Sequence, residues 1–164
     1  MASISNSNLY QFDAGTHDFS GACVVLVKTE WNAHVVDALE EGCRKVLSQY
    51  GVNKIVTLTV PGAVELTFAV KAYAHSPQQK ADAFITLGCV IQGDTPHFDY
   101  VCQSVTAGVT ELNLSLDVPV IFGVLTVNTQ AQADERIGGA HGHKGEEAAL
   151  TALKMIALNL SLKK

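Results

Sequence analysis

The sequence predicts an α/β fold, a three-layer α/β/α sandwich built on a four-stranded parallel sheet. Two observations predict it. Short runs rich in β-branched residues alternate regularly with stretches whose apolar residues recur at helical spacing. The short runs are also apolar nearly throughout, which is typical of strands whose two faces are both covered by helices.

The elements follow one another as repeated strand–helix units. The first strand is expected at 22–28 (ACVVLVK), and the helix after it at 33–50, where Gly51 supplies the stop. Crossovers between such units are right-handed, and the sheet is expected to be flavodoxin-like. The remaining units are strand 54–60 with helix 62–75, strand 83–91 with helix 96–115, strand 119–127 with helix 129–137, and a last helix at 144–162.

Length and composition indicate one domain that associates with copies of itself. The 164 residues suit a single domain at 21–164, preceded by a flexible N-terminal arm at 1–20. Hydrophobic residues make up 48% of the chain and charged residues only 16%, so some apolar surface is expected between subunits. The only linker-like segment is GGAHGH at 138–143.

Charge and cysteine usage exclude several classes of protein. A net charge of −5 with no basic stripe argues against nucleic-acid binding, which depends on clustered Lys and Arg. No run reaches the roughly 18 apolar residues of a membrane span, and the first residues lack a secretory pattern. The four cysteines form no CxxC pair, which favours free thiols in the cytoplasm; they are Cys23, Cys43, Cys89 and Cys102.

Ligands of parallel sheets bind where the carboxyl ends of the strands meet the following loops. Four loops are therefore expected to hold the functional residues. They are TEWN (29–32), VPGAVE (60–65), QGDTPH (92–97) and TVNT (126–129).

The GDTPH stretch has the composition of an anion site beside a histidine. Pro96 suits the first turn of a helix, whose free N–H groups attract negative charge, and Thr95 adds a hydroxyl. Gly93 lets a ligand approach the backbone, and His97 lies next to this site. The alternative is that Asp94 or Thr95 only caps the helix and His97 is a solvated surface residue.

A phosphate beside Asp94 needs a full positive charge from elsewhere, because a helix end supplies only about half a charge. The sequence has two arginines. Arg44 lies within one helical turn of acidic residues and is expected to form an ion pair there. Arg136 ends a helix before the glycine-rich segment, where its guanidinium is free to bind an anion or simply to remain solvated. Lys144 is a second candidate cation.

Of three further candidate residues, two have two open interpretations each. Trp31 follows a strand, where its ring stacks on a heteroaromatic ligand or packs in the core. Glu65 binds a ligand or only offsets the dipole of the helix that begins near Pro61. Phe122 lies inside a strand and is core by default. The HxH pair of His141 and His143 has no further ligand at useful spacing, so no metal is expected.

Taken together, five segments resemble the lumazine synthase family over about residues 23–158. The segments are TEWNAHVVDALEEG, VPGAVELTFAVK, LGCVIQGDTPHFDYV, PVIFGVLTVNTQAQADERIG and HKGEEAALTALKMI, in that order. The resemblance implies that residues 21–164 are a lumazine synthase domain. It also implies a transferase of riboflavin biosynthesis without a cofactor. The reaction joins 5-amino-6-(D-ribitylamino)uracil to 3,4-dihydroxy-2-butanone 4-phosphate, giving 6,7-dimethyl-8-ribityllumazine, phosphate and water.

The resemblance also implies a role for each candidate residue. The ring at Trp31 stacks on the pyrimidine, Glu65 holds ribityl hydroxyls, and His97 shuttles protons as the catalytic residue. The remaining substrate-binding residues are Asn32, Gly62, Ala63, Val64, Cys89, Val90, Ile91 and Phe122. The phosphate-binding residues are Gly93, Asp94, Thr95, Arg136 and Lys144.

The resemblance further implies a homopentamer, packed into an icosahedral shell of sixty subunits because the segment from Arg136 to Lys144 is compact. Phe122 and Arg136 would enter the active site from the neighbouring subunit, and riboflavin synthase is an implied partner. Three other interpretations stay open: an archaeal-type riboflavin synthase, a flavin-binding or storage protein, and a purely structural shell protein.

Overall fold

The computed structural model describes residues 7–12 and 17–163, and it contains a four-stranded parallel sheet in the order β2-β1-β3-β4. Because the chain passes from β1 outward to β2 and then returns to the other side of β1, the order is flavodoxin-like. The predicted fold class is confirmed. The strands are β1 (Cys23–Thr29), β2 (Lys54–Val60), β3 (Ala83–Ile91) and β4 (Val120–Val127).

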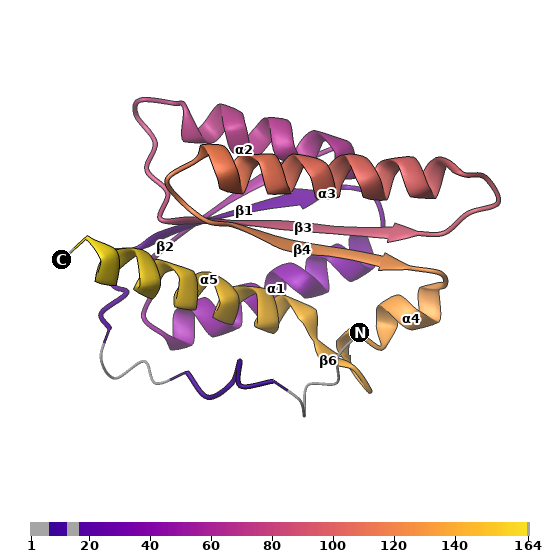
Figure 1. Cartoon of the computed structure of the whole chain (residues 1–164). Helices are drawn as coiled ribbons and strands as arrows, with labels where there is room; N and C mark the ends of the chain where they lie inside the picture. The colour runs from indigo at the N-terminus through magenta and orange to yellow at the C-terminus, as the bar shows by residue number, and fades with distance from the viewer. Residues whose placement is uncertain (1–6, 13–16, 164) are drawn as a thin grey trace.

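Helices cover both faces of the sheet and complete the three layers (Figure 1). α1 (Ala33–Gln49) and α5 (Lys144–Leu162) lie on one face. α2 (Leu66–Ala74) and α3 (His97–Ser115) lie on the other. A short helix, α4 (Gln130–Asp134), follows β4 at the carboxyl edge of the sheet.

The core consists of two apolar clusters, one on each face of the sheet. Alternate residues of the central strands enter opposite clusters: Leu26 packs with the α1 and α5 side chains, and Val25 with those of α2 and α3. Both residues are fully buried. The uninterrupted apolar character of β1 and β3 thus reflects two covered faces, whereas β2 and β4 are edge strands with partly exposed residues.

The described part of the N-terminal segment packs against the α1 and α5 side of the molecule. Phe19 is 1% exposed, and Leu9 and Phe12 pack against the same cluster. Lys154 of α5 lies 5.7 Å from the Phe12 ring and donates a hydrogen bond to the Asn8 carbonyl. Parts of the expected arm, 1–6 and 13–16, lie outside the described residues, so its flexibility stays a prediction.

Within the described chain, no helix is long and apolar enough to span a bilayer.

The segment after β4 differs from the prediction. The expected helix at 129–137 ends at Asp134, so Arg136 lies beyond its last turn. The glycine-rich 138–143 segment, predicted as a linker, lies instead within a small antiparallel hairpin of β5 (Ile137–Gly139) and β6 (Gly142–His143). Gly138 (φ 117°) and Gly142 (φ 75°) adopt backbone angles that other residues rarely tolerate, which explains the chain reversal.

The expected helix at 62–75 also begins differently, with one turn of 3₁₀ helix, η3 (Ala63–Glu65), before α2.

On the opposite face, Arg44 donates to the Glu40 carboxylate at 2.8 Å and to the Thr57 hydroxyl at 2.6 Å. The predicted ion pair of Arg44 is therefore confirmed.

Replacing Gly145 with alanine should destabilise the fold strongly. A Cβ at this position would overlap the Leu39 carbonyl oxygen, because α5 approaches the α1 backbone directly there. Because the backbones of α1 and α5 are both rigid there, we expect the free energy of unfolding to fall by about 3 kcal/mol. Urea unfolding followed by circular dichroism at fixed protein concentration measures it. Gly21→Ala is the matched control, since nothing lies within 4 Å of a Cβ there, and an equal effect of both changes would contradict the prediction.

Candidate functional site

A cavity of about 550 Å³ opens at the carboxyl edge of the sheet. It brings together eleven residues from four separate segments of the chain. Ten of them were predicted from the sequence, and the eleventh, Val101, lies one helical turn beyond His97. Its i+4 spacing from His97 was the signal that could have identified it. The lining residues are Trp31, Asn32, Gly62, Ala63, Val64, Glu65, Cys89, Val90, Ile91, His97 and Val101.

The strand order explains why these segments meet. β1 and β3 are neighbours, but the chain leaves them in opposite directions, so the loops beyond their carboxyl ends diverge and leave a crevice. Trp31 and Asn32 follow β1, whereas residues 89–91 end β3. The loop after β2 closes the crevice on one side and the first turn of α3 closes it on another.

The indole of Trp31 is available to a ligand. Its side chain is 73% exposed, so the core-packing interpretation is wrong. A Cβ added to Gly62 would lie 3.0 Å from the Glu65 carboxylate oxygen and 3.7 Å from the Trp31 ring. Gly62 therefore preserves open space between a flat aromatic ring and an exposed carboxylate.

The β3 edge of the cavity offers backbone groups and apolar side chains. Val90 and Ile91 are half-buried, and Cys89 is buried. Burial, reinforced by the negative charge of Asp134, raises the pKa of the Cys89 thiol to about 11. The thiol is therefore protonated at neutral pH and is not a nucleophile there.

The loop between β3 and α3 carries the predicted anion-binding residues Gly93, Asp94 and Thr95, all exposed. They precede His97 directly but do not line the cavity of Trp31. Pro96, and neither Asp94 nor Thr95, occupies the N-cap position of α3. His97 is exposed in the first turn of α3 and faces the cavity.

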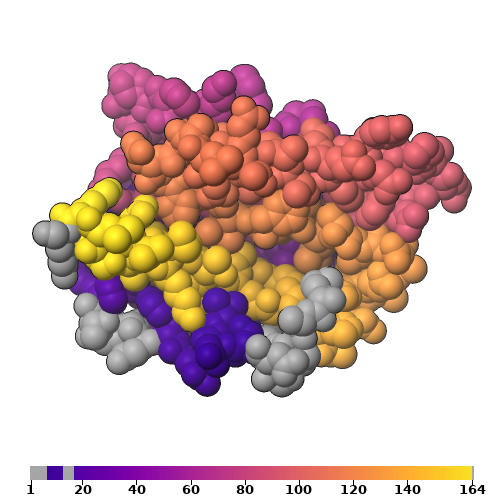
Figure 2. All heavy atoms as spheres, in the orientation of Figure 1, coloured from indigo at the N-terminus to yellow at the C-terminus, as the bar shows by residue number. Residues whose placement is uncertain are grey.

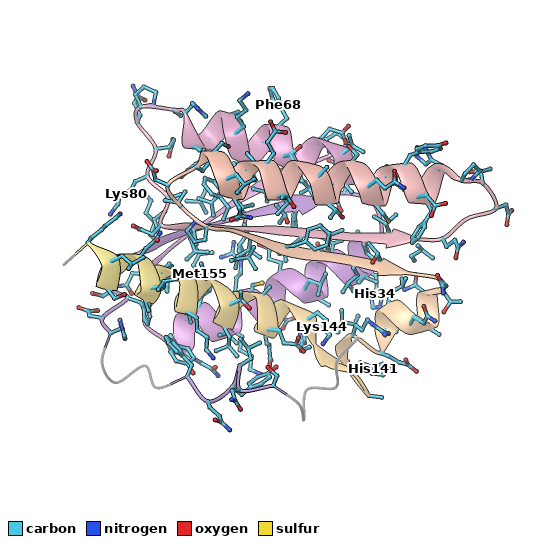
Figure 3. The ribbon with its side chains drawn as sticks, viewed as in Figure 1. His34, Phe68, Lys80, His141, Lys144 and Met155 are labelled. Carbon is cyan, nitrogen blue, oxygen red and sulfur yellow. The ribbon has the colours of Figure 1, made fainter. Side chains whose placement is uncertain are left out.

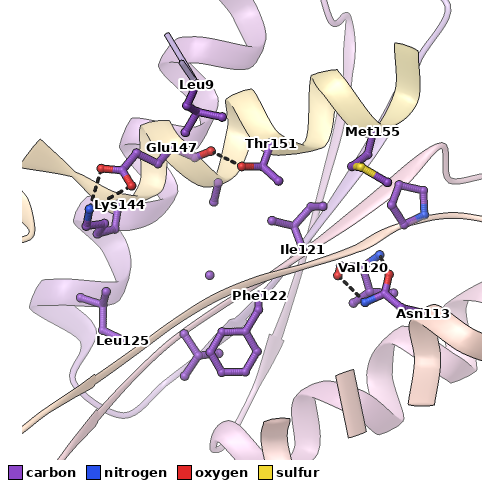
Figure 4. A pocket seen from close by; sticks show the side chains of 14 residues that line it. Leu9, Asn113, Val120, Ile121, Phe122, Leu125, Lys144, Glu147, Thr151 and Met155 are labelled. Carbon is purple, nitrogen blue, oxygen red and sulfur yellow. Dashed lines mark hydrogen bonds and ion pairs between the residues drawn. The ribbon is translucent and has the colours of Figure 1, made fainter. Parts of the chain in front are cut away.

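Two other predicted residues line a different cavity, of about 530 Å³, beside the edge strand β4 (Figure 4). Phe122 projects from β4 and is 40% exposed, so its default assignment to the core is wrong. Lys144 donates two hydrogen bonds, of 2.7 and 2.9 Å, to the Glu147 carboxylate. The hollow lies between the orange surface of α3 and β4 and the yellow surface of α5 (Figure 2).

Arg136 is held more firmly than the sequence indicated. The residue is 9% exposed, so the interpretation as a solvated side chain is wrong. Its Nη1 donates to the Gln132 carbonyl at 2.7 Å and lies 3.9 Å from a Glu135 carboxylate oxygen. Its buried Nε has no partner among the described residues. The Lys144 amide donates to the Arg136 carbonyl at 2.9 Å, which ties the two cationic residues together through their backbones.

Most of the predicted residues therefore form two groups within one protomer, whereas Gly93, Asp94, Thr95 and Arg136 line neither cavity. The group around Trp31, Glu65 and His97 lines one cavity, and Phe122 and Lys144 line another. Within residues 7–12 and 17–163, no three His, Cys, Asp or Glu side chains gather as they would around a metal ion.

Comparison with known proteins identifies the family of the chain. The family model described as 6,7-dimethyl-8-ribityllumazine synthase matches residues 21–159. The proteins of that name from Parabacteroides distasonis and Bacteroides fragilis are 48% and 49% identical to the chain. The first alignment covers 91% of this chain and 94% of the relative, and the second covers 85% and 97%. The chain belongs to the 6,7-dimethyl-8-ribityllumazine synthase family.

Proposed function

We propose that the protein condenses 5-amino-6-(D-ribitylamino)uracil with 3,4-dihydroxy-2-butanone 4-phosphate to form 6,7-dimethyl-8-ribityllumazine, phosphate and water. It is a transferase of riboflavin biosynthesis. The observation that carries this proposal is the single cavity in which an exposed indole, a carboxylate and an imidazole meet at the carboxyl edge of the sheet. An indole stacks on a planar substrate, a carboxylate accepts hydrogen bonds from its hydroxyls, and an imidazole transfers protons.

Residues of this cavity can contact the ring, the polar edge and the ribityl chain of the pyrimidine substrate. Its ring stacks on Trp31, and its polar edge meets the backbone of Ala63 and residues 89–91. The ribityl hydroxyls donate to Glu65. Asn32, Gly62 and Val64 complete the wall of the cavity.

His97 moves protons during the condensation. Attack of an amine on a ketone, loss of water to give an imine, loss of phosphate and ring closure each need a proton transferred near neutral pH. Imidazoles exchange protons in that range. Because the cavity also holds two substrates together, part of the acceleration comes from removing the entropy of their encounter.

The phosphate group binds between two protomers. Gly93, Asp94 and Thr95 supply backbone and hydroxyl groups at the start of α3, while Arg136 and Lys144 of the adjacent protomer supply positive charge. Phe122 of that protomer closes the site. This proposal is supported by the separation of the two groups of residues within one chain and by the unpaired Nε of Arg136, the latter as seen among the described residues.

The protein forms a homo-oligomer, and we propose a pentamer that packs into a sixty-subunit shell. Large apolar side chains are exposed on the α2–α3 side, including Phe68 (76%; Figure 3), Tyr100 (67%) and Leu114 (84%). Light scattering behind a size-exclusion column should give a five-fold or sixty-fold multiple of the 17.4 kDa protomer mass. A monomer would contradict both the shared site and the shell.

Two finer proposals concern the cellular setting. Riboflavin synthase is the proposed partner, because it would consume the lumazine product. The cytoplasm is the proposed location. It is supported by the four cysteines, which are all free thiols, as is usual in a reducing compartment; three of them are buried.

The deciding experiment incubates the purified protein with both substrates and follows lumazine fluorescence together with phosphate release. Equal amounts of the two products are expected, and neither forms when one substrate is omitted. Riboflavin formed from lumazine alone would indicate a riboflavin synthase. Binding of lumazine or riboflavin without phosphate release would indicate a storage protein, and neither binding nor turnover would indicate a structural shell protein.

A further inference from the structure

The loop that carries Trp31 is tied to the ends of three strands. The Asn32 side-chain amide donates to the Cys89 carbonyl at the end of β3, at 2.8 Å. The amide of Glu30 donates to the Val60 carbonyl at the end of β2, at 2.9 Å. The buried Thr29 hydroxyl donates to the carbonyl of Trp31 itself, at 3.3 Å. Of these bonds, only that of Asn32 crosses the crevice between β1 and β3.

Asn32 also has an unusual backbone conformation. Its φ of 56° and ψ of 44° are left-handed, and throughout residues 7–12 and 17–163 it is the only non-glycine with a positive φ. Asparagine tolerates this conformation better than most residues do. The Asn32 carbonyl accepts hydrogen bonds from the amides of Val35 and Val36, which begin α1. The sharp reversal therefore takes the chain from the exposed indole directly into α1, one face of which is buried.

We propose that Asn32 is a positioning residue: its side-chain amide holds the Trp31 loop at a fixed distance from the β3 edge of the cavity. The aromatic platform and the backbone of residues 89–91 come from different strands, yet both must contact one planar ligand. One hydrogen bond spans the gap between them. The identity of that ligand rests on the proposed function, but the positioning itself does not.

Trp31 is the only tryptophan in the chain, so its fluorescence reports on this loop without labelling. Two variants isolate the hydrogen bond from the backbone conformation. Asn32→Gly keeps access to the left-handed region but removes the amide. Asn32→Asp keeps the shape and the tolerance of positive φ, but it replaces the donor with an acceptor that faces the Cys89 carbonyl.

Time-resolved anisotropy of the substrate-free protein is expected to show greater nanosecond motion of the Trp31 ring in both variants than in the wild type. In steady-state kinetics, the KM for the pyrimidine substrate should rise about five-fold, the equivalent of one net hydrogen bond. The kcat and the KM for the phosphate substrate should stay near their wild-type values. Asn53→Gly and Asn53→Asp are matched controls, because the Asn53 amide also donates to a backbone carbonyl, that of Ser20, but does not line the cavity.

Unchanged Trp31 anisotropy in both variants overturns the inference, even if the KM rises, because a residue that only contacts substrate leaves the free protein unaltered. Greater Trp31 motion with an unchanged KM for the pyrimidine overturns it as well. If the wild type makes no lumazine, the proposed function fails separately, and the anisotropy comparison still decides whether Asn32 positions Trp31.

Discussion

Replacing Arg136 with alanine should raise the KM for the phosphate substrate about 100-fold, because a charge-assisted bidentate contact is lost. The guanidinium is anchored by its bond to the Gln132 carbonyl, and its buried Nε has no partner within the described part of the chain. It is thus oriented before substrate arrives, with donors left to bind the phosphate. The KM for the pyrimidine and the kcat should change much less.

Steady-state kinetics with each substrate varied in turn makes this measurement. Arg136→Lys keeps the charge but loses the planar fork, so an increase of only about ten-fold is expected. The other arginine provides a matched control: Arg44 of α1 is paired with Glu40 and with Thr57 of β2, and Arg44→Ala should leave both KM values unchanged. An unchanged KM for the phosphate substrate in Arg136→Ala would refute the phosphate assignment.

Replacing His97 with alanine should lower kcat about 100-fold without abolishing turnover. The side chain lies in the first turn of α3 and lines the same cavity as Trp31 and Glu65. It is therefore placed to reach a carbonyl or amine of a bound substrate. The residual rate comes from holding the two substrates together, which the cavity does whether or not the imidazole is present.

The measurement is kcat, with lumazine formation as the signal. His97→Ala should lower it while both KM values stay close to wild type. His75→Ala is the matched control, because His75 follows α2, bonds to the Lys71 carbonyl and does not line the cavity. Equal effects of the two changes would show that His97 has no special role in proton transfer.

Local patterns in the sequence predict the strands well, because β1 and β3 are buried on both faces and carry apolar residues at nearly every position. They predict the end of α4 poorly. The run QAQADER has helical residues, but the helix stops at Asp134 because Gly138 and Gly142 reverse the chain just beyond it. Turn geometry at two glycines thus overrides the helix propensity of the residues before them.

Periodicity and right-handed crossovers, which are local rules, predict the layers and the carboxyl edge as the place of the cavity. Most residues that line the cavity were predicted instead from the resemblance to the lumazine synthase family. The folded chain, in contrast, decided that Phe122 is exposed on the edge strand β4. It also decided that Arg136 is buried and that Asn32 bonds across the crevice to Cys89. These features depend on contacts between segments distant along the chain, which no local pattern records.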